Sequence, residues 1–218
     1  MEFLFEDENI AVCIKPVGVL SQESADKNDM VNILRKECKS EIYPVHRLDK
    51  AVGGVMVFAK TQKSATNLSK QIAEHEFTKE YYAAVGGIME KENDVFEDLL
   101  FKDSSKNKTF VVKRMRKGVK KAKLSYKVIA AGTLGESAVS LVKIRLFTGR
   151  SHQIRVQFAS RKHPLLGDGK YGDRNGSKNI ELWSHKIVFK NPASGEVMSF
   201  SADPLEGTMM HSLLNAQK

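Results

Sequence analysis

The distribution of apolar and polar positions along the chain predicts a protein with many short strands. The apolar run Ile10–Ile14 is rich in β-branched residues, and the turn-forming segment Lys15–Gly18 ends it. The uninterrupted apolar segment Gly53–Ala59 predicts a buried strand, and Lys79–Gly86 predicts another that ends at a glycine. After Leu124, strand-forming residues recur between turn residues, so the second half should be mostly sheet. The segments concerned are Ser125–Ile129, Ala138–Leu146 and Lys186–Phe189.

Two segments instead have the spacing of amphipathic helices. Apolar residues recur at helical intervals in Asp29–Glu37, where Asp29 is placed to cap the first turn. The segment Ser64–Ile72 has the same spacing. Strands joined by short turns, with few helices, predict an α+β fold on a mixed, largely antiparallel sheet rather than a doubly wound one. We expect one domain over residues 1–218, which could be bilobal, because domains commonly run to ~100–200 residues.

The composition favours a polyanionic partner. The chain has 35 Lys and Arg residues against 26 Asp and Glu, which gives a formal net charge of +9. Each phosphate that such cations neutralise releases counterions and adds affinity that does not depend on sequence. Many basic proteins bind no nucleic acid, so the charge alone does not identify the partner.

Cysteine usage and hydropathy exclude several classes of protein. Cys13 and Cys38 are far apart in the sequence and form no C-x-x-C motif, so we expect neither a disulfide framework nor a zinc site. The first residues, Met1–Glu8, are acidic where a signal peptide would be basic, and no apolar run approaches the ~18 residues of a membrane span. The expected location is cytoplasmic.

The densest group of charges is the segment Lys113–Lys123, which holds seven cations in 11 residues around Gly118. It predicts a basic hairpin or loop. One interpretation is a solvated surface loop. The other is an arm that contacts phosphates and positions RNA without selecting its sequence. In the second interpretation the contacting residues are Lys113, Arg114, Arg116, Lys117, Lys120 and Lys121.

A first segment that could carry chemistry is the tetrad His46–Asp49. It directly precedes a glycine pair and the buried strand predicted at Gly53–Ala59, and functional side chains often occupy loops held by such rigid elements. The alternative interpretation of Asp49 is a surface salt bridge.

A second segment, Leu146–Arg155, breaks at a glycine and then presents Arg150, His152, Gln153 and Arg155. Ile154 and Val156 bracket Arg155 as in a strand, which would direct the arginine to the opposite face. A carboxylate nucleophile has to stay ionised in a site that excludes water, and an adjacent guanidinium stabilises the ionised form. Asp49 and Arg155 could form such a pair.

A third segment, Lys79-Glu80-Tyr81, supplies a phenol. The Tyr81 side chain could stack on a base or move a proton, although a strand tyrosine is more often part of the core or its rim.

Taken together, these segments resemble one family. The HRLD tetrad, the K-x-Y-x-A pattern from Lys79 and the TGRSHQIR segment from Thr148 occur in the order and approximate spacing of RluA-type pseudouridine synthases. Two further segments are similar to family motifs: Lys15–Ser21 matches K-P-x-G-x-x-S, and Gly167–Gly172 matches G-D-x-x-Y-G. The resemblance spans about residues 6 to 200.

The resemblance implies roles for individual residues. Asp49 would be the catalytic nucleophile, Tyr81 would stack on the target base and assist proton removal, and Arg155 would be the salt-bridge partner of Asp49. Arg47 would enter the space left by the extruded base, while His46 would shape the loop. The residues expected to contact RNA, besides those of the basic segment, are Arg47, His46, Arg150, His152 and Gln153.

The resemblance also implies an overall organisation. We expect a single pseudouridine-synthase-like catalytic domain over residues 1–218, with a central cleft and no separate S4 RNA-binding domain. The partner would be ribosomal or transfer RNA, and the protein would act as a monomer, with no metal and no cofactor.

Pseudouridine formation breaks the bond between N1 and C1′, rotates the uracil and joins C5 to C1′ with no net redox change. Asp49 could attack C1′, add to C6 or abstract the ribose 2′ proton, and the sequence does not choose among these routes. Two other functions stay open. One is a non-catalytic RNA-binding protein that keeps the fold. The other is a glycosidic hydrolase of nucleic acid, although most glycosidases use two carboxylates and no second acid accompanies these motifs.

The chain differs from the family pattern at two places. It has Val52-Gly53-Gly54 where a Thr-Ser-Gly-like stretch is usual, and Gln157 where the third motif commonly ends in His. Neither change removes a proposed catalytic group. We expect them to affect RNA contacts, and hence the choice of substrate, more than the reaction.

Overall fold

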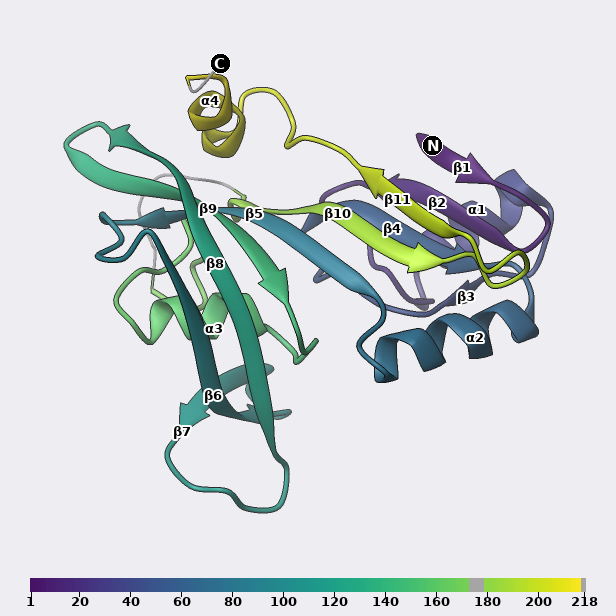
Figure 1. Cartoon of the computed structure of the whole chain (residues 1–218), viewed down its shortest axis with the longest axis horizontal. Coiled ribbons are helices and arrows are strands. Elements are labelled where there is room, and N and C mark those ends of the chain that lie inside the picture. The colour runs from purple at the N-terminus through teal and green to yellow at the C-terminus, as the bar shows by residue number, and fades with distance from the viewer. Residues whose placement is uncertain (173–178, 217–218) are drawn as a thin grey trace. The chain divides into compact units, whose positions relative to one another are not determined.

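The computed structural model describes residues 1–172 and 179–216, which divide into two compact units (Figure 1). Unit 1 consists of Met1–Lys79 and Trp183–Asp203. Unit 2 consists of Glu80–Leu182 and Pro204–Lys218.

Unit 1 is built on strands in the order β1-β2-β4-β10, with β3 paired to β4 and β11 paired to β10. The β4–β10 pairing is parallel and the other pairings are antiparallel. The strands are β1 (Phe3–Glu6), β2 (Ile10–Lys15), β3 (Tyr43–Pro44), β4 (Gly53–Ala59), β10 (Leu182–Lys190) and β11 (Val197–Ser201).

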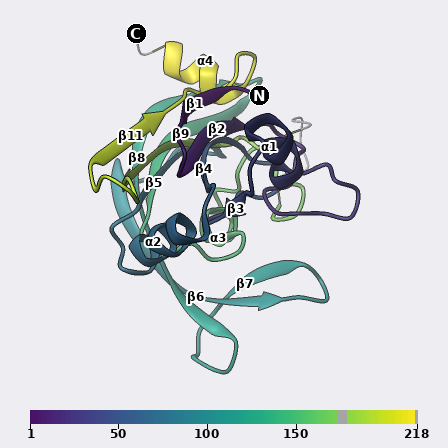
Figure 2. The same cartoon turned by 90° about the vertical axis from the view of Figure 1, so that its right-hand side faces the viewer.

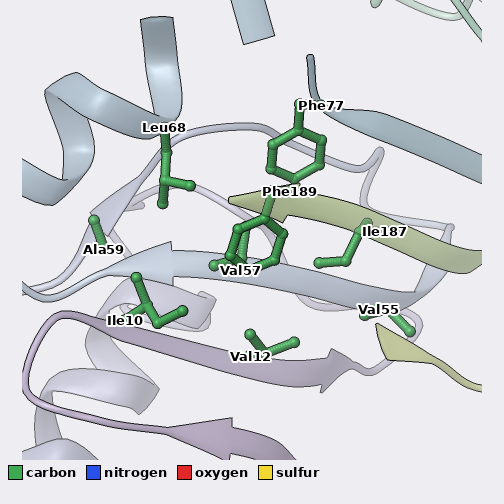
Figure 3. Close-up of a cluster of buried hydrophobic side chains, with 9 residues drawn as sticks. All are labelled: Ile10, Val12, Val55, Val57, Ala59, Leu68, Phe77, Ile187 and Phe189. Carbon is green, nitrogen blue, oxygen red and sulfur yellow. The ribbon is translucent and has the colours of Figure 1, made fainter. Parts of the chain in front are cut away.

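The two helices of unit 1 are those that the apolar spacing predicted. Helix α1 (Met30–Cys38) begins after Asp29, whose carboxylate accepts the Asn32 N–H and so confirms the predicted cap. Helix α2 (Gln62–Ala73) is capped in the same way by Thr61. Figure 3 shows the core beneath α2, in which apolar side chains of the helix, of β2 and β4 and of β10 pack together. Its members are Ile10, Val12, Val55, Val57, Ala59, Leu68, Phe77, Ile187 and Phe189.

Unit 2 contains strands in the order β5-β9-β8-β6-β7, and the β9–β8, β8–β6 and β6–β7 pairings are antiparallel. Figure 2 shows β7 alongside β6 from a second direction. The elements are β5 (Thr78–Gly86), β6 (Asn93–Asp103), β7 (Lys108–Val112), β8 (Val119–Leu134), β9 (Ser137–Leu146), α3 (Gln153–Ala159) and α4 (Met209–Asn215). The α+β class and the mixed, largely antiparallel pairing are therefore confirmed.

The basic segment is not a hairpin. Strands β7 and β8 pair with opposite sides of β6, so residues 113–118 form a loop that passes from one side of β6 to the other (Figure 1). The Arg116 guanidinium lies 4.9 Å from the ring centroid of Phe101 on β6, and this contact anchors the loop to that strand. Residues 119–123 already belong to β8. A hairpin would have required β7 and β8 to be neighbours.

The prediction that Arg155 lies in a strand is wrong, because Gln153–Ala159 is the helix α3. Five of its seven residues are buried, and the Phe158 ring packs edge-on against the rings of Phe96 and Tyr126 on the sheet. From Gln153 to Phe158 polar and apolar residues alternate, which is the period of a strand, and the burial of both glutamines leaves no exposed polar face that would identify a helix. His152 starts the helix with φ +51°.

Candidate active site

Asp49 lies in unit 1, in the loop between β3 and β4, and both residues beside it are fixed. Leu48 donates its N–H to Ser21 Oγ (3.0 Å), and the Ser21 hydroxyl donates to Leu48 O (2.9 Å). On the other side, Lys50 O accepts the Gly18 N–H (2.8 Å). The Lys15–Ser21 segment thus holds the backbone on both sides of Asp49.

The Lys15 side chain is fully buried beneath this loop. Its Nζ donates to Val19 O (2.7 Å) and Pro16 O (2.9 Å), and lies 3.4 Å from Lys50 O. Burial lowers the pKa of Lys15 to about 8, and the negative charge of Asp49 acts in the opposite direction. The result is a buried positive charge within electrostatic reach of Asp49.

The glycine pair after Asp49 is required by the packing of β4 on β10. A Cβ on Gly53 would lie 2.5 Å from the Trp183 ring, and one on Gly54 would lie 2.2 Å from Ser184 O. Gly54 also has φ +117°, which L side chains rarely adopt. Of these two positions only Gly53 differs from the family pattern, and the Trp183 ring explains why it has no side chain.

Two further residues of the tetrad have different roles. Arg47 is exposed and available to contact RNA. His46 is only partly exposed, its Nε2 accepts the Val57 N–H (3.2 Å), and its ring packs at 5.5 Å from Phe77. Burial, helped by the charge of Lys79, lowers the pKa of His46 to about 3, so the ring is neutral near pH 7. His46 therefore helps to fix the loop, and its expected contact with RNA stays a prediction.

Tyr81 and Arg155 both lie in unit 2. Tyr81 is on β5 and is buried. Arg155 is in the first turn of α3 and makes a bidentate ion pair with Asp168: Nε to Oδ2 is 2.8 Å and Nη2 to Oδ1 is 2.7 Å. The Arg155 guanidinium also lies 5.3 Å from the ring centroid of Tyr171. Within unit 2, Arg155 is thus oriented by two residues that no sequence argument had assigned to it.

The loop before α3 is fixed by Gln153, which was expected to contact RNA. Gln153 is buried, its Oε1 accepts from the Thr148 hydroxyl (2.8 Å) and the Arg150 N–H (3.0 Å), and its Nε2 donates to Lys123 O (3.1 Å). Both polar ends of the amide are used inside the protein, which supports a role for Gln153 in fixing the loop, and its contact with RNA stays a prediction.

The other two predicted residues of this loop lie near its surface. Arg150 is exposed, and its Nε donates to Lys121 O (2.9 Å), so it lies beside the start of β8. His152 is partly buried, and its Nδ1 lies 2.8 Å from the Tyr171 hydroxyl.

All six cations predicted in the basic segment are exposed. Lys113, Arg114, Arg116 and Lys117 lie in the loop before β8, and the remaining two lie on the first residues of that strand. The structure thus gathers Arg150 and the beginning of β8 on unit 2, whereas Asp49 and Arg47 belong to unit 1.

Three positioning residues were missed in the sequence, although the motifs that contain them had been noted. Lys15 belongs to the K-P-x-G segment, and Asp168 and Tyr171 belong to the G-D-x-x-Y-G segment. The signal in the sequence for these residues was a charged residue or a tyrosine at a fixed position beside turn glycines. Neither motif indicated which side chain it would contact.

Other kinds of site find little support. Across residues 1–172 and 179–216, no group of three or more His, Cys, Asp or Glu side chains could hold a metal ion. Within those same ranges, no helix combines the length and the apolar character needed to cross a membrane. Cys13 and Cys38 are free thiols, and burial raises the pKa of Cys13 to about 12, so it is not a reactive thiolate near neutral pH.

Comparison with known proteins gives matches along nearly the whole chain. A family model described as RNA pseudouridylate synthase matches residues 9–160. Ribosomal large subunit pseudouridine synthase D of Zymomonas mobilis is 31% identical over 224 residues, which cover 93% of this chain and 69% of that protein. tRNA pseudouridine synthase C of Vibrio parahaemolyticus is 29% identical over 225 residues, or 93% and 91% of the two chains. The solved structure of Human RNA Pseudouridylate Synthase Domain Containing 4 has the same fold, with a TM-score of 0.78 at 23% identity over 99% of this chain and 92% of that one.

Proposed function

This chain belongs to the RNA pseudouridylate synthase family, and on that premise we propose that it converts particular uridines of structured RNA to pseudouridine with Asp49 as the nucleophile. It is an RNA isomerase. The two relatives described above carry large-subunit ribosomal RNA and transfer RNA in their names, and those are the two classes of substrate that we propose.

The proposed reaction requires a carboxylate and involves no net redox change. The N1–C1′ bond breaks, the uracil turns, the C5–C1′ bond forms, C5 loses a proton and N1 gains one, so that atoms and electrons balance within the nucleotide. Asp49 can serve by attacking C1′, by adding to C6 or by taking the 2′ proton, and each route uses its ionised form.

The observation that supports Asp49 is the way in which its loop is held. Hydrogen bonds to the backbone of Leu48 and Lys50 fix the chain on both sides of it, and buried Lys15 supplies a nearby positive charge. A reacting group has to be positioned to within a fraction of an ångström, and such a loop provides that restraint.

Arg155 and Tyr81 complete the proposed catalytic set. Arg155 would form an ion pair with Asp49 and keep it ionised, and Tyr81 would stack on the extruded uracil and assist removal of the C5 proton. Arg47 would occupy the gap that the base leaves. This part of the proposal is supported by the order of the family motifs along the chain.

RNA binding is proposed for the exposed cations rather than for every polar residue of the motifs. The loop 113–118, the first residues of β8 and Arg150 present their charges to solvent, which suits contact with phosphates. His46 and Gln153 would hold loops, as their hydrogen bonds indicate. The cytoplasmic location, the monomeric state and the absence of a cofactor stay predictions.

The decisive experiment compares Asp49→Asn with the wild-type protein. Asparagine keeps the shape and loses the charge, so we expect no detectable pseudouridine, while RNA affinity and thermal unfolding stay close to wild type. Pseudouridine would be mapped by carbodiimide chemistry in total RNA from strains with and without the gene, and then measured on the identified RNA in vitro.

A matched control is Asp203→Asn, because Asp203 is also an aspartate of unit 1 but is exposed outside the proposed site. This variant should isomerise RNA at the wild-type rate. Substantial pseudouridine formation by a folded Asp49→Asn protein would rule out the nucleophile assignment. Release of free uracil by the wild-type protein would indicate a hydrolase.

A further inference from the structure

Among the ion pairs for which the structure gives the side-chain exposure of both partners, the one between Arg155 and Asp168 is the most buried. The side chain of Asp168 is 0% exposed and that of Arg155 is 11% exposed. Two parallel hydrogen bonds join them, from Nε and from Nη2 of the guanidinium. A guanidinium has five N–H donors in one plane, so fixing this edge determines where the others point.

Asp168 is itself held firmly. Its Oδ1 accepts the Lys170 N–H (3.1 Å), and its backbone N–H donates to Leu165 O (3.1 Å). The Tyr171 N–H in turn donates to Asp168 O (3.1 Å). The segment 165–172 is thus a tight turn whose geometry directs one carboxylate at Arg155.

Tyr171 forms a second restraint on the same guanidinium. Its ring lies against Arg155, while its hydroxyl accepts the Thr109 N–H of β7 (2.8 Å) and lies 2.8 Å from His152 Nδ1. The Thr109 hydroxyl donates to Ser151 O (2.9 Å), so β7 and the loop before α3 are joined at this point. The tyrosine therefore connects Arg155 with the strand that leads into the basic loop.

Stability alone does not account for this arrangement. Replacing a buried ion pair by apolar side chains of similar volume is often neutral or stabilising, because the desolvation of two charges opposes their attraction. What a buried bidentate pair provides, and an apolar cluster cannot, is one fixed direction for a charged group.

We propose that Asp168 and Tyr171 are positioning residues for Arg155, and that together they set the direction in which its guanidinium meets the catalytic carboxylate. The inference rests on the proposed function, in which Arg155 acts with Asp49. Asp168 and Tyr171 do not touch the RNA in this proposal. They act on the rate of isomerisation only through the arginine.

The test uses Asp168→Asn with a matched control at the other end of the same helix. Asp98 also makes ion-pair contacts with an arginine of this region, Arg161, with Nη1 to Oδ2 at 2.9 Å. We expect Asp168→Asn to lower the single-turnover rate constant by about 100-fold, because misplacing a catalytic group by about an ångström has that order of effect. RNA affinity should change less than about threefold. Asp98→Asn should leave the rate within about threefold of wild type.

Two further variants keep the test decisive if Asp168→Asn does not fold. Asp168→Glu retains the charge and should recover about a tenth of the wild-type rate or more. Tyr171→Phe retains the ring against Arg155 but loses the hydroxyl contacts, and should lower the rate about tenfold at unchanged RNA affinity. Thermal unfolding of every variant shows whether a loss of rate reflects a loss of structure.

The outcomes separate the inference from the proposed function. A wild-type rate in folded Asp168→Asn, or in folded Tyr171→Phe, would overturn the positioning role while leaving Asp49 untouched. An equal loss of rate in Asp98→Asn would also overturn it, because general loosening of α3 would then be the cause. An active Asp49→Asn protein would reject the proposed function, whatever the Asp168 variants do.

Discussion

The two ends of the α3 region use the same three kinds of residue and differ in how they use them. In the first turn of the helix, Arg155 pairs with Asp168 and lies against the ring of Tyr171. After the last turn, Arg161 pairs with Asp98 and lies 3.9 Å from the ring centroid of Phe96. Each end is therefore an arginine held between a carboxylate and an aromatic ring.

The difference lies in exposure and in what holds the ring. The side chains of Arg161 and Asp98 are 33% and 13% exposed, against 11% and 0% for the first pair. The Phe96 ring has no polar group and packs against Phe158 in the core, whereas the Tyr171 hydroxyl contacts β7 and the loop before the helix.

The contacts of Arg161 therefore pack the end of the helix, whereas those of Arg155 direct its charge. The Arg161 guanidinium also donates to Gln157 O (3.1 Å), so it closes the end of its own helix. The same residue types thus serve stability at one end and, in our proposal, orientation at the other. The arginine and the aspartate alone do not tell the two uses apart, whereas the hydroxyl of Tyr171, which Phe96 lacks, does.

The largest expected difference between the ends comes from exchanging arginine for lysine. Lysine keeps the charge but cannot form the planar two-point contact. We expect Arg155→Lys to lower the rate of pseudouridine formation by about 100-fold, and Arg161→Lys to change it by less than about threefold. Single-turnover assays on the identified RNA measure both. Similar losses in the two variants would remove the distinction between the ends.

A smaller effect is expected for Gln157, which lies between the two arginines. Its Nε2 donates to Asp98 Oδ2 (2.7 Å) and to Phe96 O (3.3 Å). Gln157 therefore belongs with the Arg161 pair, whose contacts stabilise the end of the helix. A histidine, the residue common in the family, can direct only one ring N–H at these two acceptors. We expect Gln157→His to reduce the free energy of unfolding by about 1 kcal/mol at an unchanged rate.

Urea unfolding and the isomerisation assay together check this prediction. A tenfold loss of rate without a loss of stability would place Gln157 with the positioning group instead.

The smallest expected effect is a difference in salt dependence. Exposed ion pairs are screened by salt much more than buried ones. We expect the stability lost in Arg161→Gln to shrink by a few tenths of a kcal/mol when NaCl is raised from about 0.1 to about 1 M, as for other partly exposed pairs. The stability lost in Asp168→Asn should stay constant over that range. A stronger salt effect on Asp168→Asn would contradict the burial described for its pair.

The sequence predicted those elements whose pattern is local. The segment Gly53–Ala59 is an uninterrupted apolar run and forms β4 with the same bounds, and Asp29 caps α1 as its position indicated. Helix α3 was mistaken for a strand, since its polar and apolar residues alternate and its glutamines are buried. A loop was one of the two structures predicted for the basic segment, but its crossing of β6 was not predicted, because strand order is a long-range property that no local pattern expresses.

The motifs indicated candidate residues for the site but not the side chains that support them. Motif order indicated Asp49 and Arg155, whose roles stay predictions, whereas the hydrogen bonds of Gln153 became known only from the fold. Asp168 lies 13 residues from Arg155 in sequence, and no spacing rule for a helix or a strand brings those two positions together. Such partners are identified only by the folded chain.

The glycine pair at the start of β4 has a consequence for how the enzyme distinguishes one uridine from another. Gly53 and Gly54 have no room for a side chain, and Val52 is 2% exposed, so the two positions that differ from the family pattern here, Val52 and Gly53, present no exposed side chain. We expect the choice of target to depend on exposed segments, and the loop 113–118, which lies between two strands and exposes its side chains, is one such segment.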